Sequence, residues 1–185
     1  MTMLRRTCLR FAAAGLAAAC ALPTAPLLAK GDKPIALSWD ELVPKDWDPS
    51  AEFTDLFEQG ADTWEDSDPR AQKLYERMRK VWDAAPTVER FNGKTVRLPG
   101  YVVALEEGKD GLSELLLVPN FGACIHTPPP PANQIIHIKL AQPVKGISSL
   151  DAVWATGTLK VTRNQSDMGV SGYSLQEAKL APYKD

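Results

Sequence analysis

The sequence has no large excess of charge of either sign, since 21 lysines and arginines stand against 23 aspartates and glutamates, a formal net charge of −2 in 185 residues. Proteins that hold nucleic acid by neutralising its phosphates carry a basic surplus, so that class is excluded. Long hydrophobic runs are also absent, which excludes a protein with several membrane-spanning helices. No glycine-rich phosphate-binding loop is present. With 44% hydrophobic and 24% charged residues, the composition is that of a globular protein with one core.

Cysteine is scarce as well. Of the three cysteines, Cys8 and Cys20 lie within residues 1–29, which are typical of a secretory signal peptide. In this segment a basic start precedes the apolar stretch Phe11–Leu22, and small residues lead up to Ala29. The stretch is shorter than the ~20 residues that a spanning helix needs. We therefore expect cleavage after Ala29, a mature protein without a membrane span, and a periplasmic location.

Two further export patterns overlap with this segment. Arg5–Arg10 resembles a twin-arginine (Tat) signal, and Leu16–Cys20 resembles a lipobox, in which Cys20 would anchor a lipoprotein. Both routes stay open beside ordinary cleavage. Removal of residues 1–29 takes away three arginines and no acidic residue, which leaves 18 basic and 23 acidic side chains and a net charge of −5.

Residues 30–67 are expected to form an N-terminal arm. Ser38 followed by Glu41 is a capping-box pattern for a short helical turn that Pro44 stops. The stretch 45–67 combines eight acidic residues with aromatic ones and shows no sustained period. We interpret it as irregular chain whose aromatic side chains anchor it to a core surface.

A helix is predicted over Pro69–Asp83. Asp68 is a suitable N-cap and Pro69 suits the first helical position. Apolar residues recur at helical spacing at Leu74, Met78 and Val81.

From residue 93 onward the period changes to that of strands. The first strand contains Pro99-Gly100, a signal for a bulge or bend, and the fourth contains Gly157 at a second bend. Five short strands with such bends favour a small OB-like barrel, with a β-sandwich as the alternative. The expected fold is therefore mainly β with α, and residues 68–185 form one helix plus this barrel. The predicted strands are 94–105, 115–118, 135–140, 152–162 and one around 172–175.

One segment gathers the residues best suited to chemistry. It holds Cys124, the only cysteine of the mature chain, and both histidines of the sequence, His126 and His137. In extended backbone Cys124 and His126 share a face, and His137 lies opposite the apolar residues of its own strand. The prolines 128–131 form a stiff turn that brings the two ends together. One thiolate and two imidazoles form a ligand set suited to zinc or copper.

Two other interpretations of this segment stay open. Cys124 could be a small buried hydrophobic residue, with the histidines satisfying backbone groups of the proline-rich loop. A Cys–His nucleophile is less well supported, because no carboxylate lies near in sequence to orient a histidine.

The chain resembles a bacterial family catalogued as domain of unknown function 3299 (DUF3299). The resemblance is carried by the segments 38–44 (SWDELVP), 96–103 (VRLPGYVV) and above all 121–134 (FGACIHTPPPPANQ), and it extends from Trp39 to the C-terminus. Asn120 departs from the pattern, where an aromatic residue is expected. The family has no agreed activity, so the resemblance implies no catalytic residue.

The resemblance implies an exported periplasmic protein or lipoprotein that belongs with ABC-type export or metal-homeostasis machinery. We expect a non-enzymatic accessory protein that binds zinc or copper through Cys124, His126 and His137 and associates with a membrane transporter. The alternative is a metal-free interaction module whose barrel face and aromatic arm dock a membrane partner.

Overall fold

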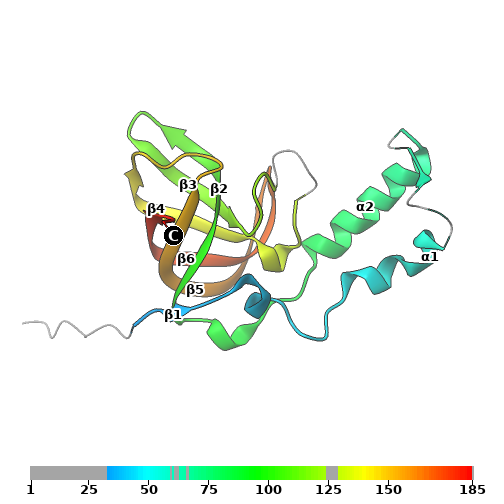
Figure 1. The fold of residues 1–185 in the computed structure, drawn as a ribbon, viewed down its shortest axis with the longest axis horizontal. Helices are drawn as coiled ribbons and strands as arrows, with labels where there is room; N and C mark the ends of the chain where they lie inside the picture. The colour runs from blue at the N-terminus through cyan, green and yellow to red at the C-terminus, as the bar shows by residue number, and fades with distance from the viewer. Residues whose placement is uncertain (1–32, 59, 61–62, 66, 124–128, 185) are drawn as a thin grey trace, which may run out of the picture. The chain divides into compact units, whose positions relative to one another are not determined.

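A computed structural model describes residues 33–58, 60, 63–65, 67–123 and 129–184 (Figure 1). The predicted signal peptide lies outside these residues. No helix in the described part of the chain is long and apolar enough to cross a membrane.

The strands form a closed barrel with one additional short strand. The order in the sheet is β1-β2-β3-β4-β6-β5, and a further pairing of β2 with β5 closes the ring. Neighbours are antiparallel except β1 with β2 and β4 with β6, which run parallel. The predicted mainly β fold with an OB-like five-stranded barrel is therefore confirmed. The strands are β1 Ile35–Ala36, β2 Thr95–Gly108, β3 Gly111–Val118, β4 Ile136–Val144, β5 Ala152–Ser166 and β6 Gly169–Pro182.

Strand β2 closes the barrel because it bends at Pro99-Gly100. Before the bend it pairs with β5, from Thr95 to Tyr101, and after it with β3, from Tyr101 to Gly108. A side chain at Gly100 would not fit, since its Cβ would lie 2.7 Å from the Leu117 side chain. The bend predicted from the sequence thus lets one strand serve two neighbours.

The barrel interior is filled by alternate side chains of the strands. In β4, Ile136, Ile138 and Leu140 point inward, as predicted, and Val96 and Leu98 of β2 are fully buried with them. The strands run further than expected at β3, β5 and β6, because each hairpin partner continues to satisfy the backbone groups of its neighbour through polar stretches.

The predicted helix, α2, spans Pro69–Asp83, and the Asp68 carboxylate accepts a hydrogen bond from the Arg70 backbone N–H. Its apolar face packs on a small cluster that is separate from the barrel interior. The arm before it is partly helical rather than wholly irregular, because Asp48 caps a short turn at Pro49. These elements are the 3₁₀ turn η2 (Pro49–Phe53) and the short helix α1 (Thr54–Phe57), and the cluster is Phe53, Trp64, Leu74, Met78 and Val81.

Hydrogen bonds from two strands, β5 and β6, help to join the N-terminal segments to the barrel. The Tyr173 hydroxyl of β6 donates to the Leu42 carbonyl at 2.8 Å and accepts from the Val88 backbone N–H at 2.6 Å. Arg163 of β5 donates to the carbonyls of Asp83 and Ala85 at the end of α2. Leu42 ends the turn η1 (Trp39–Leu42), at whose start the Glu41 carboxylate accepts from the Ser38 backbone N–H, and Val88 precedes η4 (Glu89–Phe91).

Candidate functional site

His137 lies on the outer face of the barrel, as its position in the strand predicted. It is the second residue of β4, and its partner on the neighbouring strand β3 is Leu116. Cys124 and His126 lie outside the described residues, so the predicted three-residue cluster stays a prediction. Among the described residues, no group of three or more His, Cys, Asp or Glu side chains is placed to hold a metal ion.

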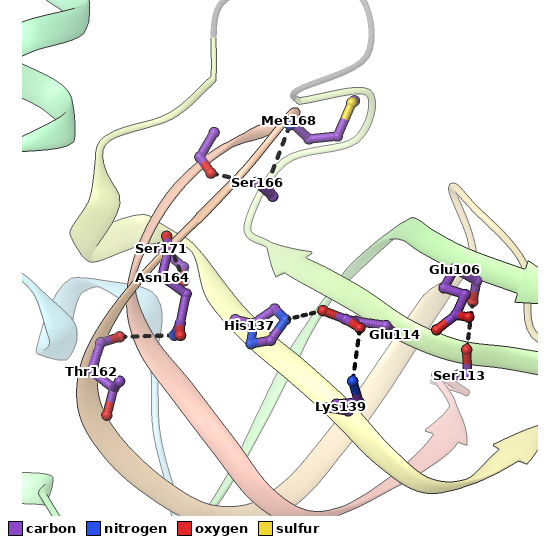
Figure 2. A network of polar contacts seen from close by, with 11 residues as sticks. Glu106, Ser113, Glu114, His137, Lys139, Thr162, Asn164, Ser166, Met168 and Ser171 are labelled. Carbon is purple, nitrogen blue, oxygen red and sulfur yellow. Dashed lines mark hydrogen bonds and ion pairs between the residues drawn. The ribbon is translucent and has the colours of Figure 1, made fainter.

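A carboxylate on the neighbouring strand contacts His137. The Glu114 Oε1 atom lies 2.7 Å from His137 Nε2, and Glu114 Oε2 lies 3.5 Å from the Lys139 ammonium (Figure 2). Because an ionised carboxylate only accepts hydrogen bonds, Nε2 carries the proton in this contact. The other ring nitrogen, Nδ1, is turned away from Glu114 in Figure 2. In the neutral imidazole that atom is a lone-pair donor available to a ligand.

The pair is largely withdrawn from solvent. The His137 and Glu114 side chains are 18% and 24% exposed, whereas Lys139 is 74% exposed. The hydrogen bond from His137 holds the pKa of the Glu114 carboxyl below its usual value, although partial burial opposes this. Glu114 is therefore ionised at neutral pH and fixes the orientation of the imidazole.

Beside this pair the outer face of the barrel carries a second apolar cluster. Its buried members come from β2, β3 and the segment between β3 and β4, with Tyr101, Leu105 and Met168 packed against them. Next to the cluster, the Phe121 ring meets the Tyr101 ring edge-on at 5.6 Å and is 68% exposed. His137, whose strand partner is Leu116, thus stands beside a buried apolar cluster that lies outside the barrel interior. The buried members are Val103, Leu116, Val118, Ala123 and Ile135.

Side-chain amides just before β4 bond the end of the proline-rich segment to earlier parts of the chain. In the turn η5 (Ala132–Gln134), the Asn133 amide donates to the Pro86 carbonyl at 3.0 Å, and the Gln134 amide donates to the Trp39 carbonyl at 3.1 Å. The Asn133 side chain is fully buried, and within the described residues its Oδ1 atom has no hydrogen-bond partner. The two amide N–H donors therefore hold the turn η5 against earlier parts of the chain.

Sequence reasoning missed Glu114. It sits 23 positions before His137 and reaches it only through the register of β3 with β4. One signal was readable: Leu115–Val118 is an unbroken apolar run, and all four residues are buried. Such a run indicates a strand covered on both faces. Glu114 directly precedes this run, and a single charged residue beside a strand that is covered on both faces is unusual.

Comparisons with known proteins agree with this architecture. A family model described as "Protein of unknown function (DUF3299)" matches residues 39–182. The crystal structure of a DUF3299 family protein from Pseudomonas aeruginosa PAO1 is similar, with a TM-score of 0.64 and 34% identity, and the match covers 83% of this chain and 99% of that chain. No curated protein matches the chain.

Proposed function

The chain belongs to the DUF3299 family, and we propose that it is an exported, non-enzymatic accessory protein that binds a transition-metal ion on the outer face of its barrel. The proposed ligands are His137, which lies on β4, and Cys124 and His126, which lie outside the described residues. Zinc and copper are the metals that one thiolate and two imidazoles suit best.

The contact between Glu114 and His137 is the observation that carries this proposal. Histidines that bind metal almost always donate their second ring N–H to a carboxylate or carbonyl, which fixes the tautomer and strengthens the ligand. Here the 2.7 Å contact from Nε2 to a partly buried, ionised carboxylate has that form and leaves Nδ1 for the metal.

Metal content and thermal stability test the proposal. Protein purified without chelator is expected to contain near-stoichiometric zinc or copper, and added metal should raise the melting temperature. A hundredfold excess of metal over Kd stabilises by about 2.7 kcal/mol, which is several degrees for a domain of this size. Cys124→Ser and His137→Ala should each abolish that rise.

The carboxylate offers a sharper test. Glu114→Gln keeps the size of the side chain but loses its charge, and it should weaken metal affinity about 10–100-fold. Glu107→Gln, a change at an exposed glutamate of β2, is the matched control and should leave affinity unchanged. Metal-free protein with no thermal response to Zn²⁺, Cu⁺ or Cu²⁺ would refute the metal-binding function.

A second candidate function is docking without metal to a membrane transporter component. It is favoured by the exposed Phe121 ring, which extends the apolar outer cluster into solvent beside Tyr101. Large exposed aromatic groups of this kind are common anchors of protein interfaces. Under this alternative, Phe121→Ser should reduce co-purification with the transporter component, whereas His137→Ala and chelator should have no effect.

Export is the remaining part of the proposal, and intact mass of the secreted product tests it. A chain that starts after Ala29 indicates a soluble periplasmic protein. A chain that starts at Cys20 and carries the added mass of diacylglycerol indicates a lipoprotein instead.

A further inference from the structure

A hollow of about 530 Å³ lies on the barrel wall formed by β2, β5 and β6, with Ala141 of β4 at its side, and its residues are not those of the His137 network. This volume falls within the usual range for small-molecule sites, roughly 300–1,000 Å³. Its polar lining consists of Thr95 of β2, Thr156 and Thr158 of β5, and Glu177 and Lys179 of β6.

A β-bulge shapes this hollow. Thr156 pairs with Lys179 and Thr158 pairs with Gln176, so Gly157 alone faces the two residues between them, Glu177 and Ala178. Glu177 adopts a φ of +52°, a left-handed conformation that strains an ordinary side chain. Bulges redirect side chains and are frequent beside functional sites. Here the bulge places the carboxylate of Glu177, a residue with a strained backbone, in the wall of the hollow.

The polar groups of the hollow are not engaged elsewhere. Within the described residues, the three threonine hydroxyls, the Glu177 carboxylate and the Lys179 ammonium form no hydrogen bond or ion pair. The Glu177 carboxylate would repel a purely anionic ligand, and the Lys179 ammonium would repel a purely cationic one. A sugar suits both, because every hydroxyl group both donates and accepts hydrogen bonds.

Aromatic side chains continue the same outer face along β5. Trp154 precedes Thr156 by two positions, and the Arg97 guanidinium lies 4.1 Å from its ring centroid. Tyr183, which directly follows β6, stacks on Trp154 with ring centroids 5.2 Å apart and is 42% exposed. Because Arg97 and Tyr183 cover the Trp154 ring, the exposed Tyr183 ring is the one that presents an apolar face on which the C–H groups of a sugar pack.

We propose that this surface binds a neutral oligosaccharide, with one sugar ring in the hollow and the next on the exposed Tyr183 ring. The site is distinct from the proposed metal site, since within the described residues no hydrogen bond or ion pair joins the hollow to Glu114 or His137. Glu177 and Lys179 would hold hydroxyl groups of the first ring, and the Tyr183 ring would contact the second.

Backbone NMR titrations of the full mature protein test this proposal with maltotriose, chitotriose and cellotriose as probes. At least one should shift the amides of Thr156, Thr158 and Lys179, with a Kd on the order of 1 mM. The corresponding monosaccharide should bind more weakly, and Tyr183→Ala should reduce the difference between the two.

Two substitutions at one position separate binding from structure. Glu177→Gln should raise Kd about tenfold, whereas Glu52→Gln, a control at an exposed glutamate of η2, should not change it. Glu177→Gly relieves the left-handed strain, so it should raise the melting temperature while also weakening saccharide binding. A purely structural Glu177 predicts the first effect without the second.

Several outcomes would overturn the proposal. One is the absence of amide shifts with all three trisaccharides at about twenty times the expected Kd. Another is unchanged affinity in Glu177→Gln. Equal shifts caused by free alanine, a zwitterion, would show that the paired charges bind any small dipolar ion.

Discussion

The Tyr173 hydroxyl gives the structure its most direct stability test. Tyr173 is fully buried in the barrel, and its hydroxyl contacts two segments that precede the barrel, at Leu42 and at Val88. Tyr173→Phe keeps the ring and its packing. It removes only the group that satisfies the Leu42 carbonyl and the Val88 backbone N–H.

The size of the effect follows from these two partners. Leu42 is fully buried, so its carbonyl would be left without a partner, at a cost of about 1–3 kcal/mol. Val88 is half-buried and water can partly replace the hydroxyl there, so its loss costs about 0.5–1.5 kcal/mol. We expect a total destabilisation of about 1.5–4.5 kcal/mol, or roughly 3–18 °C in melting temperature.

Urea denaturation measures this change, with Tyr101→Phe as the matched control. The Tyr101 hydroxyl lies on the outer face and bonds to nothing within the described residues, so the control should lose less than about 0.5 kcal/mol. The slope of the free energy with urea should not change, because the same surface is exposed on unfolding. A Tyr173→Phe variant as stable as the control would refute the reasoning.

The same residue predicts a pH effect. Burial raises the pKa of the Tyr173 phenol above its ordinary value of 10.0. The folded state therefore keeps its proton at a pH where the unfolded chain has lost it, so stability falls as pH rises through and above this value. In Tyr173→Phe the alkaline loss of stability should be smaller.

Three further substitutions test other parts of the structure. Glu114→Gln removes a carboxyl whose pKa is lowered below 4.5 in the folded protein. The stability advantage of the wild type should therefore be complete above pH 4.5 and should disappear as pH falls through the folded pKa. Urea titrations in the neutral and acid range measure this advantage. Arg163→Met removes the donors to the last carbonyls of α2 and should cost about 1–2 kcal/mol, with faster hydrogen exchange in the final turn of that helix. Gly157→Ala places a Cβ 2.6 Å from the Gln176 carbonyl oxygen, so the bulge must shift, and the melting temperature should fall by an amount equivalent to about 1–3 kcal/mol.

The barrel could be predicted from the sequence because its signals are local. Alternation along each strand placed Ile136, Ile138 and Leu140 inside and His137 outside, and Pro99-Gly100 marked the bend that lets β2 pair twice. The helix was equally readable, since its cap and its apolar spacing lie within one short segment.

Only His137 of the contacting pair could be predicted, because Glu114 and His137 lie on different strands. Nothing close to His137 in sequence specifies Glu114, and their contact depends on the register of β3 with β4, which a shift of one residue would destroy. The Glu177 bulge was hidden for the same reason, since two residues face one only after β5 and β6 are paired. Pairing of distant segments is set by the whole fold and not by the local pattern.

The position of β6 in the sheet means that the barrel cannot close until the last strand of the chain has been made. β6 is the last strand in the chain, yet it lies between β4 and β5 in the sheet. Until it is inserted, both of those neighbours present unpaired edges that invite pairing with other chains. The distant pairings also make folding comparatively slow. A chain that stops short of residue 169 would therefore keep two open edges at the centre of its sheet, and aggregation would compete with folding.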